Sequence, residues 1–184
     1  MASIFTKILR AELPCYKIFE DDLSFAFLAL DQVNLGHTLV ISKQEVDHWL
    51  NVPQDIYLRV QKNAQVIGRA IQKSTDCPRV GQMVAGFEVP HYHLHLIPAW
   101  SIPDLSFARA QKRSEQEMKE IIILITNSPD YHTIRISNPI RYAYLGSYVF
   151  LALEECLHSL SVMFEDELFK KHLIIQLGGD VGSS

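Results

Sequence analysis

The stretch that decides the fold of this chain reads Val89-Pro90-His91-Tyr92-His93-Leu94-His95-Leu96-Ile97-Pro98. Successive side chains of an extended strand point to opposite faces and each residue advances about 3.3 Å, so the three histidines should line one face about 7 Å apart. Tyr92, Leu94 and Leu96 line the other face, which suits packing against helices. The pattern predicts a half-buried antiparallel strand, ended by Pro98, with its imidazoles turned toward solvent or a ligand.

A row of imidazoles indicates chemistry more than solvation, because lysine, threonine or glutamate would serve a solvated face equally well. Imidazole titrates near neutral pH and can act as a nucleophile, a proton donor or a metal ligand. His158 and His172 stand alone in the sequence, and we interpret them as ordinary surface or core residues.

The residues His91 to Ile97 resemble the His-φ-His-φ-His-φ-φ signature (φ, apolar) of the histidine triad family of nucleotide hydrolases and transferases. Blocks similar to that family's, in the same order, are Ile4 to Ile8, Glu12 to Pro14, Phe19 to Asp22, Ala26 to Leu28 and Gly36 to Ile41. The resemblance covers residues 3 to about 125. It implies a five-stranded antiparallel sheet with helices, paired into a homodimer.

Periodicity and turn residues also predict an α+β domain. Helices are expected from Ile4 to before Pro14, over Pro53–Lys73, and after Ser114, which forms a capping box with Glu117. Strands are expected at Tyr16–Glu20, Ser24–Leu30, His37–Ser42 and Val80–Ala85, with Asp21-Asp22 and Gly36 in turns. The histidine triad domain is therefore placed at residues 1–125.

Residues 126–184 form a C-terminal extension without a family resemblance. Asn127 to Asp130 indicate a loop, His132 to Ser137 a strand, Tyr144 to Leu173 helix-like content, and Gly178 to Ser184 a loose tail. The extension could be an extra packing layer, a dimer or partner surface, or sequence with no selected role.

Composition describes an ordinary globular protein of one domain, with 48% hydrophobic and 21% charged residues. A formal charge of −4 argues against extended nucleic-acid binding, which needs clustered lysine and arginine. The three cysteines, Cys15, Cys77 and Cys156, are too scattered for a disulfide framework or a Cys-x-x-Cys zinc site. No signal peptide is visible, and the longest apolar run, Tyr142 to Leu153, is too short to span a membrane, so a cytoplasmic location is expected.

The family resemblance implies a role for each histidine. His93 would be the nucleophile that attacks the α-phosphate and carries a covalent nucleotidyl group, and His95 would contact the phosphate and the leaving-group side. His91 would orient His93 through its backbone carbonyl, and His37 would complete the imidazole cluster from the neighbouring strand. A protonated imidazole beside the nucleophile would assist the leaving group near pH 7.

The resemblance also implies a purine nucleotide pocket, made of Ile4, Phe5, Ile8, Leu13, Phe27, Leu28, Ala29, Leu30, Gly86 and Glu88. Many relatives have aspartate at the position of Ala29 to hold the ribose, and Asp31 cannot simply replace it in the same pose. Glu88 stands where many have serine or threonine, and its charge would repel an anionic leaving group but pair with an amine. Ser3 and Thr6 replace a zinc-binding Cys-x-x-Cys, so we predict neither structural zinc nor any other cofactor.

These features predict a metal-independent hydrolase of nucleoside 5′-phosphoramidates or related α-phosphate bonds. A dinucleoside polyphosphate hydrolase is the close alternative. A zinc site on the triad strand, with His37 or Glu88 as further ligands, is another. The last is a non-catalytic nucleotide-binding scaffold whose partner surface is the C-terminal extension.

Overall fold

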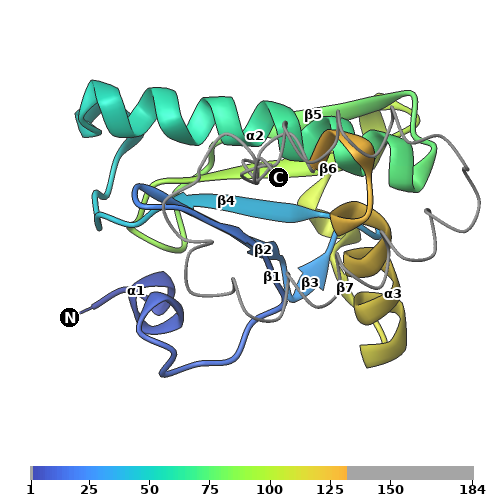
Figure 1. Ribbon diagram of the computed structural model, residues 1–184, viewed down its shortest axis with the longest axis horizontal. Helices are drawn as coiled ribbons and strands as arrows, with labels where there is room; N and C mark the ends of the chain where they lie inside the picture. Colours follow the sequence, from blue (N-terminus) through green and yellow to red (C-terminus); the bar gives the residue numbers. More distant parts are fainter. Residues whose placement is uncertain (1, 132–184) are drawn as a thin grey trace, which may run out of the picture. The chain divides into compact units, whose positions relative to one another are not determined.

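The computed structural model describes residues 2–131, which lie within one compact unit, Met1–Asn138 (Figure 1). In chain order its elements are α1 (Ile4–Leu9), β1 (Lys17–Glu20), β2 (Ser24–Leu28), β3 (Asp31–Gln32), β4 (Thr38–Ser42), η1 (Trp49–Asn51), α2 (Gln54–Thr75), β5 (Arg79–Met83), β6 (His93–Ala99), η2 (Ile102–Leu105), η3 (Phe107–Arg109), β7 (Gln111–Lys112) and α3 (Glu115–Thr126), where η denotes a 3₁₀ turn. The predicted extension from residue 132 onward, with Cys156, His158 and His172, lies outside the described residues.

Five strands form an antiparallel sheet in the order β1-β2-β4-β6-β5, which confirms the predicted fold class. The triad strand β6 lies next to the edge, between β4 and the edge strand β5. A separate two-residue ladder joins β3 to β7 and was not expected from the sequence.

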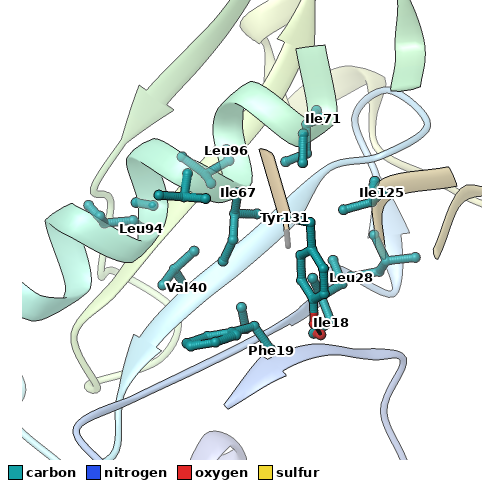
Figure 2. Close-up of a cluster of buried hydrophobic side chains, with 14 of the residues drawn as sticks. Ile18, Phe19, Leu28, Val40, Ile67, Ile71, Leu94, Leu96, Ile125 and Tyr131 are labelled. Atoms are coloured by element: carbon teal, nitrogen blue, oxygen red, sulfur yellow. Dashed lines mark hydrogen bonds between the residues drawn. The ribbon is translucent and has the colours of Figure 1, made fainter. Parts of the chain in front are cut away.

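Helices cover both faces of the sheet (Figure 1). On one face α2 and α3 pack over alternate residues of the strands, among them Leu28, Val40 and Leu94, in the core drawn in Figure 2. On the other face a smaller apolar cluster joins Phe5 of α1 to Phe27. The apolar side of the triad strand therefore packs against α2 as predicted, and its histidines share the other face of the sheet with α1.

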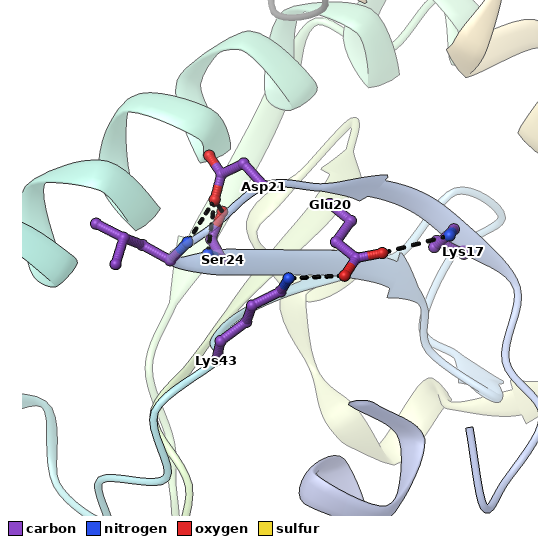
Figure 3. A network of polar contacts seen from close by, with 6 residues as sticks. Lys17, Glu20, Asp21, Ser24 and Lys43 are labelled. Carbon is purple, nitrogen blue, oxygen red and sulfur yellow. Dashed lines mark hydrogen bonds and ion pairs between the residues drawn. The ribbon is translucent and has the colours of Figure 1, made fainter. Parts of the chain in front are cut away.

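The hairpin of β1 and β2 is closed by Asp21, whose Oδ1 accepts the backbone N–H groups of Ser24 at 2.7 Å and Leu23 at 3.0 Å (Figure 3). Its other oxygen accepts from Asn63 of α2 at 2.6 Å, so the turn is tied to the helix. Beside it, Glu20 pairs with Lys43 at 2.7 Å. A buried carboxylate with several donors stabilises this corner of the sheet.

The helix signals in the sequence are confirmed by the structure. Ser114 caps α3 in the predicted capping box with Glu117, whereas Ser3, which is the N-cap of α1, was not predicted as a cap. The predicted helix from Pro53 to Lys73 runs to Thr75 and ends where Asp76 adopts a left-handed conformation. Gly36 has φ of +98°, and a Cβ there would lie 3.2 Å from Thr75, so this turn requires glycine.

The triad strand differs from its prediction at both ends. The strand was expected to follow a loop over Gly86 to Pro90 and so to begin at His91, but it begins at His93, and His91 precedes the ladder. It also continues through Pro98, which pairs with Val80 of β5. The N and C=O of one strand residue point to the same side, and the Pro98 carbonyl accepts from the Asn34 side chain at 2.8 Å. Proline has no backbone N–H, and at Pro98 this group would point away from β5 to a place beyond the end of β4. No hydrogen bond of the ladder is therefore lost there.

Helix α3 is followed by Tyr131, which is buried in the main core and donates to the Ile18 carbonyl at 2.5 Å (Figure 2). The packed unit therefore includes residues beyond the end of α3. Among residues 2–131, no helix combines the length and the apolar character needed to cross a bilayer.

Candidate active site

A cleft of about 550 Å³ opens on the histidine face of the sheet, a volume typical of small-molecule sites. Its walls come from α1, the end of β2 with the turn after it, β4, β6, the loop before the triad, and η3. The lining residues are Ile4, Phe5, Ile8, Pro14, Cys15, Phe27, Leu28, Ala29, Leu30, Asp31, His37, Leu39, Ala85, Gly86, Phe87, Glu88, Val89, His93, His95, Phe107 and Ala110.

This cleft brings together almost all the residues that the sequence singled out. His37, His93 and His95 line it, as do all the predicted nucleotide-binding residues except Leu13. Leu13 is exposed and not part of the wall, and His91 is fully buried and not part of it either. The three triad histidines therefore do not share one open row, since the first lies within the protein and the other two line the cleft.

His93 is held in one tautomer by the backbone of His91. Its Nδ1 lies 2.6 Å from the His91 carbonyl oxygen, and since a carbonyl can only accept, Nδ1 carries the proton. Nε2 of the neutral ring then keeps its lone pair. The ring is only 5% exposed, with Phe5 packed edge-on at 5.0 Å between ring centres, but it forms part of the cleft wall.

The His91 ring has a partner at each nitrogen. Nε2 donates to the Ser42 carbonyl at 2.7 Å, and Nδ1 lies 2.8 Å from the Ser3 hydroxyl. The side chain of His91, the residue expected to orient His93, is thus fixed between α1 and the end of β4.

His37 and His95 form a second imidazole pair, with His37 Nε2 at 3.0 Å from His95 Nδ1. In the ladder, Leu39 of β4 lies opposite His95, which places His37 diagonally across from it on the same face. Phe107 of η3 packs edge-on against His95, with 4.8 Å between ring centres. Asn34 donates to the carbonyls of Pro98 in β6 and Asp104 in η2, at 2.8 and 3.0 Å, and so ties its loop to the chain just before η3.

Burial lowers the pKa of every imidazole in the cluster, because removal from water disfavours the charged form. The pKa of His37 falls to about 4 and that of His95 to about 3, and the pKa values of His91 and His93 are also lowered. The expectation of a protonated imidazole near pH 7 is therefore wrong for the free protein, in which the cluster is neutral.

The charged residues that line the cleft are both acidic. Asp31 and Glu88 are exposed on its wall, whereas no lysine or arginine of residues 2–131 lines it. Ala29 leaves the wall apolar at the position where the resemblance implied an aspartate, and Asp31 lies two residues further along the same wall. Among the same described residues, no group of three or more His, Cys, Asp or Glu side chains is arranged to hold a metal ion.

Some site residues were missed by sequence reasoning. Phe107 lies in a short 3₁₀ turn that has no periodic pattern, and Ser3 was noted only as a replacement for cysteine. Glu45, which accepts from the Ser3 backbone, is 42 residues from its partner and carries no local signal. Of these three residues, Ser3 alone had a local signal: a serine directly before the apolar residues of a short helix is typical of an N-cap.

The five-stranded antiparallel sheet thus presents the pair of His37 and His95, together with His93, to one cleft. Residues 10–101 match the HIT domain, and this chain belongs to the HIT (histidine triad) family. An uncharacterised HIT-like protein of Borreliella burgdorferi is 35% identical over 132 residues, covering 67% of this chain and 95% of that protein.

Two further relatives are informative. The adenosine 5′-monophosphoramidase hnt1 of Schizosaccharomyces pombe is 34% identical over 102 residues, covering 53% of this chain and 74% of its own. The crystal structure of a Hit-like protein from Bartonella henselae, involved in cell-cycle regulation, superposes with a TM-score of 0.61 at 28% identity, covering 67% of this chain and 93% of that one. The family and the fold are thus shown by sequence and by structure.

Proposed function

We propose that this protein hydrolyses nucleoside 5′-phosphoramidates through a covalent nucleotidyl intermediate on His93. The observation that carries the proposal is the hydrogen bond from His93 Nδ1–H to the His91 carbonyl, because it leaves the lone pair on Nε2 of a ring in the cleft wall. A lowered pKa keeps that ring unprotonated and nucleophilic near neutral pH.

The reaction proceeds in two displacements. In the first, the His93 Nε2 lone pair forms a bond to the α-phosphorus while the bond from phosphorus to the leaving nitrogen breaks. The phosphate's negative charge raises the pKa of the imidazoles beside it, so His95 can hold the proton that the departing amine takes. In the second, water attacks the phosphorus while the now neutral His95 takes its proton, the bond to His93 breaks, and the nucleoside monophosphate leaves.

Charge in the cleft favours an amine leaving group over a polyphosphate. The carboxylates of Asp31 and Glu88 attract a cationic amine and repel a chain of phosphates, and no lysine or arginine within residues 2–131 offsets them in the wall. An S. pombe relative named as an adenosine 5′-monophosphoramidase supports the same class of substrate. The dinucleoside polyphosphate hydrolase is the weaker alternative on this ground.

The nucleoside would lie in the apolar part of the cleft. Phe5 of α1 packs edge-on against Phe27 in the smaller apolar cluster, and both line the cleft together with Ile4 and Ile8. Aromatic and aliphatic walls of this kind suit a purine base. This part of the wall has no carboxylate at Ala29 to hold the ribose, so the base supplies most of the contact area.

The decisive experiment incubates the protein with an adenosine 5′-phosphoramidate that is radiolabelled at phosphorus, quenches in base, and maps the label by peptide mass spectrometry. We expect label on His93, and a fall in turnover on the order of 10⁴-fold or more for His93→Ala. His48→Ala is the matched control, because His48 is exposed and does not line the cleft. Wild-type turnover in a folded His93→Ala protein would overturn the proposal.

A non-catalytic nucleotide-binding scaffold would instead bind adenosine monophosphate tightly and show no turnover of any substrate.

A homodimer and a cytoplasmic location also stay predictions. The edge strand β5 and the exposed side chain of Leu58 on α2 offer hydrogen-bonding and apolar surface for a second copy. Sedimentation analysis measures the assembly directly.

A further inference from the structure

A polar cluster that does not line the cleft connects the start of α1 to the triad. The carboxylate of Glu45, in the segment after β4, accepts the backbone N–H of Ser3 at 3.1 Å and the hydroxyl of Thr6. The Ser3 hydroxyl in turn accepts the Thr6 backbone N–H at 3.1 Å as the N-cap of α1, and it contacts His91 Nδ1 at 2.8 Å. The contacts run without a gap from an exposed carboxylate to a fully buried imidazole.

The protons in this cluster can be assigned from what each partner can do. The Ser42 carbonyl only accepts, so the His91 proton lies on Nε2 and Nδ1 of the neutral ring must accept. Ser3 therefore uses its one hydroxyl proton for His91 Nδ1. The hydroxyl of Thr6 is then left to donate to Glu45, which matches the contact observed there.

Glu45 is suited to its place as the outer acceptor. Hydrogen bonds from Thr6 and from Ser3 lower the pKa of its carboxyl, so it stays ionised at neutral pH. An ionised acceptor forms stronger hydrogen bonds than a neutral one. The carboxylate thus ties the first turn of α1 to the segment after β4.

We propose that Ser3 and Glu45 are positioning residues for the nucleophile, acting through His91. Glu45 holds the start of α1, Ser3 occupies His91 Nδ1, and His91 is thereby held where its carbonyl accepts from His93 Nδ1–H. Helix α1 also supplies Phe5, which packs against both rings at 5.7 and 5.0 Å between centres. One surface carboxylate therefore influences both the apolar wall and the orientation of the reacting ring.

Loss of the Ser3 hydroxyl would leave His91 Nδ1 buried without a partner, which is costly for a polar atom. The ring can relieve this cost by turning, and that change disturbs the carbonyl that holds His93. A residue that served only as a helix cap would affect α1 and not the state of these two rings.

The test uses Ser3→Ala, Ser3→Thr and Glu45→Gln, with Glu12→Gln as the control. Threonine keeps both the N-cap acceptor and the hydroxyl proton, so it should restore what alanine removes. Glu45→Gln alters only an exposed side chain, so that variant folds even if Ser3→Ala does not. Glu12 is exposed at the end of α1 and makes an ion pair with Arg10 at 3.9 Å that is not part of the cluster.

The first readout is ¹⁵N NMR of the histidine rings, which does not depend on any activity. In the wild type we expect His91 to be protonated on Nε2 and His93 on Nδ1. In Ser3→Ala both ring signals should shift and His93 should become a mixture of tautomers, whereas Ser3→Thr and Glu12→Gln should match the wild type. Unchanged His91 and His93 signals in folded Ser3→Ala or in Glu45→Gln would overturn the proposal.

The second readout rests on the proposed function and measures the rate of label transfer to His93 in a single turnover. We expect Ser3→Ala to slow it about tenfold and Glu45→Gln by a smaller factor, with the affinity for adenosine monophosphate changed less than about twofold. If the variants lost affinity for adenosine monophosphate but kept the wild-type rate of label transfer, the cluster would serve only to anchor α1 and the positioning role would be wrong. If the wild type itself transfers no label, the proposed function fails and the NMR result still decides the positioning role.

Discussion

Nε2 of His37 lies 3.0 Å from Nδ1 of His95, and this contact sets the proton positions of the two rings on this side of the cleft. The backbone N–H of Val33 donates to His37 Nδ1 at 3.4 Å, so the proton of the neutral His37 ring lies on Nε2 and is donated to His95. His95 then carries its own proton on Nε2. The pair thus presents a hydrogen-bond donor beside His93 even while both rings are neutral.

This arrangement predicts the tautomers of the two rings. We expect long-range ¹⁵N–¹H NMR spectra at pH 7 to show both His37 and His95 protonated on Nε2, with no charged ring. The backbone carbonyl of Asp31 is a competing acceptor for His37 Nδ1–H. A proton on Nδ1 of both rings would mean that this carbonyl prevails, and His95 would then accept a hydrogen bond from the substrate instead of donating one.

Acid sensitivity is the second prediction. The pKa values of His37 and His95, about 4 and about 3 in the folded protein, lie below the 6.5 of a free imidazole. Between pH 6.5 and about pH 4 the unfolded chain binds more protons than the folded protein. The free energy of unfolding is therefore highest above pH 6.5 and falls as the pH drops toward 4. Each ring contributes a slope of at most about 1.4 kcal/mol per pH unit.

Urea unfolding from pH 7 to pH 4 measures this dependence. His37→Gln and His95→Gln should each flatten the fall in stability, whereas His48→Gln, an exposed histidine outside the cluster, should leave the slope as it is. Equal slopes in all four proteins would show that the rings titrate normally and that burial does not hold them neutral.

The third prediction concerns the choice of leaving group. Glu88→Gln removes one of the two carboxylates in the cleft wall, and because the side chain is exposed its pairing with an amine is worth only about 0.2 to 1 kcal/mol. We expect kcat/KM for an amine-leaving phosphoramidate to fall about 1.5- to 5-fold, and kcat/KM for a dinucleoside polyphosphate to rise. Both changes should shrink at high salt.

Asp22→Asn is the matched control for that experiment. Asp22 is an exposed acid in the turn between β1 and β2 and does not line the cleft, so its loss changes net charge equally without changing the wall. If both variants change the two substrates alike, the selectivity comes from overall charge and not from Glu88.

Features that depend on local pattern were predicted well from the sequence. Alternation placed Leu94 and His93 on opposite faces, and the Ser114–Glu117 spacing placed the start of α3, because both signals depend on neighbours in the chain. The burial of His91 inside the protein could not be predicted in this way, since it depends on Ser42 and Ser3, which are remote in sequence.

The lowered pKa values were missed for the same reason. They arise from burial by elements that the sequence does not mark as neighbours, such as the 3₁₀ turn that places Phe107 against His95. The segment just before that turn is held by the side chain of Asn34, which donates to the backbone carbonyls of Pro98 in β6 and Asp104 in η2, more than sixty residues away. Contacts of this kind appear only once the chain has folded.

The last prediction tests how far the packed unit extends past α3. Tyr131 is only 7% exposed and its hydroxyl donates to the Ile18 carbonyl in β1, so it joins the end of the described chain to the edge of the sheet. Tyr131→Ala should lower the free energy of unfolding by about 3 to 5 kcal/mol through the cavity it leaves, and Tyr131→Phe by about 1 kcal/mol through the lost hydrogen bond. Ile123→Ala on the exposed side of α3 should change it by less than about 1 kcal/mol. If Tyr131→Ala were as stable as Ile123→Ala in urea unfolding, a truncation after Thr126 would leave the packed unit intact. The packing observed instead requires any truncated chain to keep residue 131.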